Sequence, residues 1–371
     1  MNGQFRDVPA QVLAAVFEEP GKPFQLRVFP QPVLGEGQLL VEVTCCTICG
    51  SDLHTIHGRR DVAGPTILGH EIIGCIAELS TDCHDIDGQP LAIGDRISWS
   101  IAASCGRCQN CQAGIPQKCD KLFKYGHHVV DDDGPLSGGL AQVCHLVPGT
   151  SIVRIPDEIP DAVACPANCA TSTVAAAFRV AGDCANKSVV IHGAGMLGLT
   201  AAAMARHSGA TEVIVTDIAR ERLDRAHQFG ATKTLLAGTA EVQASVLEIA
   251  EGRGADFVFD MSGSPEAIEQ SIGMLSVNGC LVLVGSVFPT RSVDFNPEQI
   301  VRKLLRIEGV HNYIPADLKT AFQFLKQVHQ QYPFASLVDA EFPLVEVNQA
   351  IERAQAPDVV RVAVRPIDRK M

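Results

Sequence analysis

The chain has 371 residues, of which 46% are hydrophobic and 19% charged, and its formal net charge is −12. This composition is typical of a soluble globular enzyme, and the length exceeds one ordinary core, so we expect two domains. The acidic balance argues against nucleic acid and against an anionic membrane surface as partners. A notable uncharged run, residues 162–178, is too short and too polar to span a bilayer.

Residues 1–14 lack a basic stretch followed by an apolar core, so we read no signal peptide. The sequence contains 14 cysteines, which in a chain of this size without an export signal indicate metal ligands and free thiols in preference to disulfides. Six cysteines occupy metal-like positions. We expect the other eight to be reduced thiols in a cytoplasm: Cys45, Cys46, Cys75, Cys83, Cys144, Cys165, Cys184 and Cys280.

The first 150 residues read as a β-rich domain. Residues 39–44 have a strand pattern, residues 68–79 are apolar runs broken by Gly69 and Gly74, and residues 91–98 read as a turn entering a strand. Glycine and proline interrupt this region often, as in a barrel-like β domain.

The pattern changes after about Ala164, and from Lys187 to Val287 strands and helices alternate. Alternation of this kind predicts a parallel, doubly wound sheet. Beyond His311 we expect one more helix and a short final strand. The expected strands are 188–192, 213–216, 256–260, 279–284 and 359–364, and the expected helices are 198–207, 219–229 and 316–328.

Four cysteines cluster within a short, apolar-poor segment: Cys105, Cys108, Cys111 and Cys119. Four thiolates this close in sequence can close a tetrahedron around zinc without help from the rest of the fold. Reduced surface thiols or an iron–sulfur cluster are the alternatives, but nothing in the sequence indicates an electron-transfer partner. A closed site of this kind predicts a structural zinc.

Three further donors lie far apart: Cys49 in Cys49–His54, His70 in Gly69-His-Glu71, and Cys169 in an uncharged stretch. A catalytic zinc takes about three protein ligands and keeps one position open, and these residues supply that count. Each has an ordinary alternative as a buried cysteine or a satisfied histidine, and sequence spacing does not prove that they meet.

A glycine-rich stretch follows the predicted strand 188–192 and opens a helix. The motif is Gly193-Ala-Gly195-Met196-Leu197-Gly198, and Asp217 ends the next strand. In this context G-x-G-x-x-G predicts a dinucleotide site, with the pyrophosphate on the helix N-terminus. The Asp217 carboxylate would accept ribose hydroxyls and repel a 2′-phosphate, which favours NAD over NADP. FAD or a methyl donor is the alternative ligand.

Taken in order and spacing, these motifs resemble the zinc-containing medium-chain alcohol dehydrogenases over essentially the whole chain. The resemblance implies catalytic zinc on Cys49, His70 and Cys169, with Glu71 as a nearby carboxylate and Asp52 orienting the histidine. It implies a proton relay through Ser51 and His54. It also implies coenzyme contacts from Thr173, Arg222, Gly285 and Arg361.

The resemblance defines an α/β protein with two domains. A β-rich, GroES-like catalytic domain comprises residues 1–169 and 312–371, a Rossmann NAD-binding domain comprises residues 170–311, and the active site lies in a cleft between them. We expect two zinc ions and NAD per subunit, a small alcohol or aldehyde as substrate, and a homo-oligomer, either a tetramer or a dimer. The rivals are a zinc-free reductase of quinones or enals and a non-catalytic, zinc-stabilised binding protein.

Arg60 gives a prediction about the substrate class, because it aligns with a usually apolar position of the family's alcohol pocket. Ile101 is a second candidate pocket residue. A buried guanidinium would favour an anionic substrate, whereas the alternative is a solvated surface pair of Arg59 and Arg60. The strings 46–54, 122–127 and 166–170 resemble a bacterial branch associated with phosphonate catabolism. We therefore predict a small hydroxyalkyl phosphonate, with a polyol or other neutral secondary alcohol as the alternative.

Overall fold

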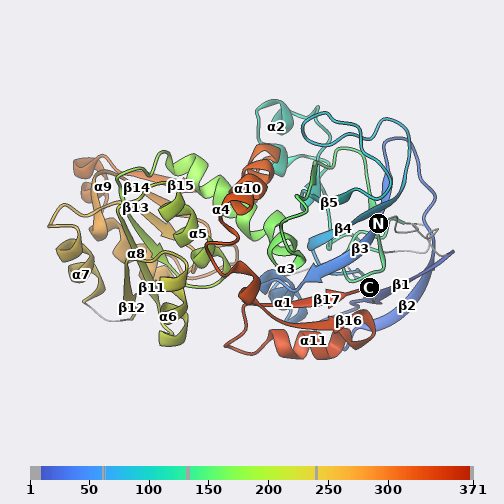
Figure 1. The fold of residues 1–371 in the computed structure, drawn as a ribbon. Helices are drawn as coiled ribbons and strands as arrows, with labels where there is room; N and C mark the ends of the chain where they lie inside the picture. The colour runs from blue at the N-terminus through green and yellow to red at the C-terminus, as the bar shows by residue number, and fades with distance from the viewer. Residues whose placement is uncertain (1–9, 61, 63, 131–133, 239–240, 368–371) are drawn as a thin grey trace. The chain divides into compact units, whose positions relative to one another are not determined.

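The computed structural model describes the chain except residues 1–9, 61, 63, 131–133, 239–240 and 368–371, so most of the segment read for a signal peptide lies outside the described residues (Figure 1). The fold divides into two compact units. The first comprises Met1–Cys169, Ile314–Lys326 and Phe334–Met371, and the second comprises Ala170–Tyr313 and Gln327–Pro333. Among the described residues, no helix is long and apolar enough to cross a membrane.

The first unit is built on a mixed sheet with the strand order β16-β17-β3-β4-β5-β9, in which β8 also pairs with β3. β3 and β4 form its centre, and most of their residues are buried, several of them in one core cluster with Trp99 and Tyr125. The strands are β3 (Leu39–Thr47), β4 (Glu71–Leu79), β5 (Arg96–Trp99), β8 (Val143–Leu146), β9 (Ile152–Arg154), β16 (Val338–Pro343) and β17 (Arg361–Arg365).

Two small antiparallel ribbons, β1–β2 and β6–β7, complete the strands of this unit. The ribbon strands are β1 (Gln11–Val16), β2 (Gln25–Pro30), β6 (Ala102–Ala103) and β7 (Phe123–Lys124). Its helical elements are α1 (Gly50–Ile56), α2 (Gln109–Gln112), η1 (Pro116–Lys118), α3 (Asp161–Ala164), η2 (Cys165–Asn168), α10 (Pro315–Val328), η3 (Phe334–Leu337), η4 (Leu344–Glu346) and α11 (Val347–Ala354), of which α10 runs into the second unit.

The second unit contains a six-stranded, fully parallel sheet in the order β12-β11-β10-β13-β14-β15. The predicted doubly wound sheet is therefore confirmed. Its strands are β10 (Ser188–His192), β11 (Glu212–Asp217), β12 (Lys233–Leu236), β13 (Ala255–Asp260), β14 (Leu275–Leu283) and β15 (Arg306–Gly309), and its helices are α4 (Ala170–Ala181), α5 (Met196–His207), α6 (Arg220–Gln228), α7 (Val242–Ile249), α8 (Pro265–Met274) and α9 (Pro297–Lys303).

Helices cover both faces of this sheet. Val190 of the central strand β10 packs in a cluster with Val246 of α7 and Ile268 of α8, while its neighbour Ile191 faces Gly198 of α5. A strand covered on both sides has a nearly continuous apolar run, here Val189 to Ile191, which is why 188–192 was recognisable in the sequence. The edge strands β12 and β15 are short and largely uncovered, and their sequences did not indicate strands.

Candidate active site

The scattered metal group begins where β3 ends and α1 starts. Cys49 lies at the N-cap of α1, and its backbone N–H donates to Asp52 Oδ2 over 2.9 Å. The other carboxylate oxygen, Oδ1, accepts from Nδ1 of His70 at 3.1 Å. Asp52 therefore holds a cysteine and a histidine in one arrangement and leaves Nε2 of His70 as the nitrogen available to a metal.

Asn168 holds the third segment of the group. Its side-chain amide is fully buried and donates to the carbonyl oxygens of His70 (2.9 Å) and Trp99 (3.0 Å). Because Asn168 directly precedes Cys169, these two hydrogen bonds tie the end of η2 to the start of β4 and to the end of β5. Asn168 was not among the predicted site residues, because an amide that holds backbone carbonyls leaves no sequence motif.

The structure brings together four predicted residues whose ligand atoms all lie within 4.8 Å of one another: Cys49, His70, Glu71 and Cys169. Two sulfurs and one imidazole nitrogen are the donors that a catalytic zinc prefers. The Cys169 thiol hydrogen-bonds Cys49 and lowers the pKa of the Cys49 thiol well below its usual range; burial opposes this shift, and Arg361 and His70 reinforce it. The donor chemistry fits zinc.

The Glu71 carboxylate belongs to the metal group but is also held in an ion pair with Arg361. Its two carboxylate oxygens accept from Nε and Nη2 of Arg361, each at 2.8 Å, and Thr47 donates a third hydrogen bond at 2.6 Å. Burial raises the pKa of Glu71 and the Arg361 charge counteracts the rise. Arg361 also lies 3.5 Å from Cys49 Sγ, so the residue predicted to reach a pyrophosphate is placed beside the metal group. The pyrophosphate contact stays a prediction.

The two predicted relay residues lie on α1. Ser51 Oγ is 3.3 Å from His70 Nε2, next to the metal group, and His54 follows one helical turn later. Partial burial lowers the pKa of His54, and the neighbouring charges of Arg59 and Arg60 lower it further. A histidine that is neutral at neutral pH can accept a proton, which is the state that a relay requires.

Of the two predicted pocket residues, Arg60 is connected to the metal group through His127. Arg60 is partly buried, unlike the exposed Arg59, and its Nη1 donates to His127 Nε2 over 2.7 Å. The His127 ring lies 5.7 Å from the His70 ring, centroid to centroid. Ile101 is buried, and its carbonyl oxygen accepts from the backbone N–H of Tyr125. The structure thus adds the segment around His127 to the predicted pocket.

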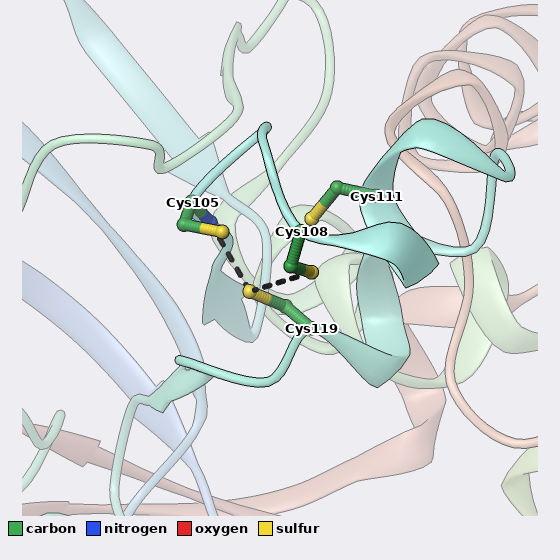
Figure 2. A group of neighbouring side chains, drawn as sticks. All are labelled: Cys105, Cys108, Cys111 and Cys119. Atoms are coloured by element: carbon green, nitrogen blue, oxygen red, sulfur yellow. Dashed lines mark hydrogen bonds between the residues drawn. The ribbon is translucent and has the colours of Figure 1, made fainter.

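The cysteine quartet forms a second, separate group in which all four sulfurs converge (Figure 2). Backbone N–H groups of Cys105 and Lys121 donate to Cys119 Sγ over 3.2 and 3.3 Å. Hydrogen bonds from the backbone of Arg107 and Cys108 lower the pKa of Cys105 to about 6. Backbone donors that stabilise thiolates are what a closed zinc site requires, so the quartet fits the predicted structural zinc.

The glycine-rich loop joins β10 to α5, at the point where the strand order of the sheet reverses. A Cβ on Gly198 would lie 1.7 Å from the carbonyl oxygen of Gly193, whereas a Cβ on Gly195 would meet nothing within 4 Å. The close approach to Gly193 explains why position 198 needs glycine. The open space at Gly195 leaves room for a phosphate to approach the N–H groups of Met196 and Leu197. The loop fits a dinucleotide.

Other predicted coenzyme residues lie in the same unit as the loop. Asp217 ends β11, and its carboxylate accepts from the backbone N–H groups of Ala194 (2.7 Å) and Ala219 (2.9 Å). Each carboxylate oxygen retains acceptor capacity for a ribose hydroxyl. Gly285 follows β14 at the same carboxyl edge, where a Cβ would lie 2.4 Å from Gly263 N. Thr173 is on α4 and Arg222 on α6.

Comparison with known proteins agrees with this geometry. Residues 35–157 match the alcohol dehydrogenase GroES-like domain, and residues 197–327 match the zinc-binding dehydrogenase family. The chain is 30% identical over 346 residues to L-threonine 3-dehydrogenase of Chromobacterium violaceum (91% of this chain, 94% of the relative). It is 29% identical over 351 residues to sorbitol dehydrogenase of Halalkalibacterium halodurans (93% and 96%).

Solved structures show the same fold. An alcohol dehydrogenase of Thermotoga maritima superposes with a TM-score of 0.89 at 29% identity, covering 96% of this chain and 100% of that one. A zinc-binding dehydrogenase of Sinorhizobium meliloti bound to NADP has a TM-score of 0.84 at 27% identity, covering 96% and 100%.

The chain belongs to the zinc-containing medium-chain alcohol dehydrogenase family, a class of oxidoreductases that act on small molecules. The predicted fold, a GroES-like domain with a Rossmann sheet, is confirmed, and zinc and a nicotinamide dinucleotide are the cofactors of this family. The comparisons do not reach the phosphonate branch, which stays a prediction.

Proposed function

We propose that this protein is a zinc-dependent, NAD-linked dehydrogenase of a small alcohol. The observation that carries the proposal is the convergence of Cys49, His70 and Cys169, with Asp52 fixing the histidine. Zinc bound there would stabilise the alkoxide form of the alcohol. In the overall reaction the alcohol carbon loses a hydride to the nicotinamide and the hydroxyl loses a proton, giving a carbonyl compound, reduced coenzyme and a proton.

The residues of this chain account for the proton. Ser51 Oγ lies next to His70 Nε2 and can take the hydroxyl proton of a bound alcohol. His54 is the next acceptor on the same helix, and its lowered pKa keeps it neutral and able to receive the proton. Asp52 keeps the His70 ring in one tautomer throughout. A non-catalytic binding protein would need no relay of this kind.

The coenzyme preference rests on Asp217. Its carboxylate is fixed by two backbone N–H groups at the edge where an adenosine ribose would lie, and a 2′-phosphate there would face a negative charge. Solved structures of this fold hold NADP in one case and NADH in another, so the fold accepts either coenzyme. We propose NAD, with Arg222, Thr173, Gly285 and Arg361 as further coenzyme residues.

The substrate proposal keeps two alternatives. The L-threonine dehydrogenase relatives, by their name, act on an alcohol that carries a carboxylate, and the sorbitol dehydrogenase relative acts on a neutral polyol. Arg60 beside the metal group favours an anionic alcohol such as a hydroxyalkyl phosphonate. We further propose a homo-oligomer in the cytoplasm, where the 14 free cysteines would remain reduced.

The test is a screen of ethanol, sorbitol, L-threonine and 2-hydroxyethylphosphonate with NAD and with NADP, read as absorbance of the reduced coenzyme. We expect NAD-dependent turnover of at least one alcohol, and loss of coenzyme discrimination in Asp217→Ala. The proposal is overturned if the zinc-loaded enzyme oxidises no alcohol and reduces no aldehyde. Equal kcat/KM with both coenzymes would contradict the role of Asp217 alone.

A further inference from the structure

A buried carboxylate lies at the carboxyl edge of the parallel sheet in the second unit. Asp260 is the last residue of β13, which pairs with the central strand β10, and its side chain is fully buried. A carboxylate in the protein interior is unfavourable unless hydrogen-bond donors surround it. The donors to Asp260 come from the two loops that follow the neighbouring strands β13 and β14.

Asp260 fixes the loop that follows its own strand. Its Oδ1 accepts from the backbone N–H groups of Ser262 (3.0 Å) and Gly263 (2.9 Å) and from the Ser262 hydroxyl (2.8 Å). The same hydroxyl accepts from the backbone N–H of Ser264, the N-cap of α8, over 3.1 Å. One carboxylate oxygen therefore holds three donors and fixes the backbone of residues 262–264.

Asp260 also holds the loop that follows β14. Its backbone carbonyl oxygen accepts from the N–H groups of Val284 (3.0 Å) and Gly285 (2.9 Å), and its Oδ2 accepts from the Ser286 hydroxyl at 3.5 Å. The two loops interlock, because a Cβ on Gly263 would lie 2.6 Å from the carbonyl oxygen of Gly285. Gly263 also has a φ of 70°, a conformation that favours glycine.

The loop after β13 contacts the glycine-rich loop as well. A Cβ on Gly193 would lie 3.3 Å from both the Cβ and the backbone nitrogen of Ser262. The backbone N–H of Met261 donates to the carbonyl oxygen of His192, the residue before Gly193, over 2.9 Å. Residues 261–263 therefore contact both the loop that fits a pyrophosphate and the loop at Gly285.

We propose that Asp260 is a positioning residue for the nicotinamide half of the coenzyme. A dinucleotide lies across the point where the strand order of such a sheet reverses. Asp217 assigns the adenosine half to β11, so the other half extends over β13 and β14, where Asp260 holds both loops. Asp260 thus sets the distance of these loops from the glycine-rich loop. The inference rests on the proposed NAD-linked function and names a further residue of the same site.

The experiment compares ligands that occupy different parts of the coenzyme site. NAD spans the whole edge, whereas AMP occupies only the adenosine end. Both are titrated calorimetrically into the zinc-loaded full-length protein and its Asp260→Ala and Asp260→Asn variants. Asp256→Ala and Asp256→Asn are the matched controls, because Asp256 lies on the same strand and accepts from the backbone N–H (2.9 Å) and the hydroxyl (3.0 Å) of Ser188 at the opposite, amino edge.

We expect Asp260→Ala to raise the dissociation constant of NAD roughly 10- to 100-fold and that of AMP by no more than about threefold, as for loss of hydrogen bonds to a charged group at one end of the site. Asp260→Asn keeps one acceptor oxygen and should show a smaller loss that is still selective for NAD. Both Asp256 variants should bind NAD and AMP like the unmodified protein. Thermal unfolding identifies a variant that does not fold, and if Asp260→Ala is one, Asp260→Asn decides.

Three results would overturn the role of Asp260. They are unchanged NAD binding in its variants, equal weakening of NAD and AMP, which would make the residue a support of the fold as a whole, or the same loss of NAD binding in the Asp256 variants. The failure of the proposed function is separate and recognisable. If the unmodified enzyme oxidises no alcohol but NAD binding still needs Asp260, the positioning role stands and the dehydrogenase assignment falls.

Discussion

The two cysteine-containing metal groups are assembled in opposite ways. The quartet from Cys105 to Cys119 lies in one short segment, and its sulfurs are held by backbone N–H groups of that same segment. The scattered group draws Cys49, His70 and Cys169 from three segments, and side chains of the surrounding fold hold them. The segment that carries the quartet depends on its metal for a stable structure. The scattered group depends on the surrounding fold to bring its metal ligands together.

The largest expected effect separates the two groups by function. Replacing Cys169 with Ser should abolish turnover and lower the zinc content from two ions per chain to one, because the open site loses one of its three ligands. Circular dichroism should show an unchanged fold. Metal analysis and steady-state kinetics provide the measurement, and a variant that keeps both zinc ions and substantial activity would contradict the assignment of this group.

The second prediction is that a change in the quartet lowers stability and spares activity, the reverse of the Cys169 variant. Cys111→Ser should lower the free energy of unfolding by at least about 3 kcal/mol, because a closed zinc site contributes folding free energy directly. Molecules that do fold should retain kcat within about threefold. Denaturant unfolding and the activity per folded chain test this. If the variant is as stable as the unmodified protein, the quartet has no structural role.

The third prediction concerns how the fold holds the scattered group. Asn168→Asp removes two donors from buried carbonyls and should weaken zinc at the open site roughly 10- to 100-fold. Chelator competition measures the affinity, and the visible spectrum of a Co²⁺-substituted enzyme reports the ligand geometry. Asn348→Asp is the control, because Asn348 also holds backbone: its Oδ1 accepts from the N–H of Phe24 and its Nδ2 donates to the carbonyl oxygen of Phe24. Equal zinc affinity in both variants would show that Asn168 is only structural.

The smallest expected effect concerns the proposed proton relay through Ser51 and His54, which has no counterpart at the quartet. Burial is the largest cause of the lowered pKa of His54, and the charge of Arg59 is the next. Arg59→Gln should therefore raise the pKa of His54 toward its ordinary value. Because the relay needs neutral His54, the acid limb of the pH profile of kcat/KM should move to higher pH. An acid limb that stays in place or moves to lower pH would remove His54 from the relay.

Local patterns predicted the parts of the protein whose structure is decided over a few residues. The apolar residues 189–191 of the strand 188–192 and the glycines after it indicated the central strand and the nucleotide loop, and both lie where expected. The α10 helix (Pro315–Val328) differs from the predicted 316–328 by one residue. Edge strands β12 and β15 were missed because half-exposed residues carry little hydrophobic pattern.

Contacts between distant segments could not be predicted in this way. Nothing in the sequence around Arg361 indicates that its guanidinium pairs with Glu71, and the resemblance pointed instead to a coenzyme phosphate. Likewise, Arg60 was a pocket candidate, but its contact with His127 appears only in three dimensions.

The sequence by itself determined the cysteine quartet, the glycine-rich loop and the α/β class, because spacing and periodicity act within one segment. Only the tertiary structure decided that Cys49, His70 and Cys169 meet, that Asp52 and Asn168 hold them, and that Arg361 lies beside them. The physical reason is that bringing distant segments together costs chain entropy that no short motif can offset. The burial of the β3–β4 core provides that free energy, and the chemistry of the site follows from where the core places its ends.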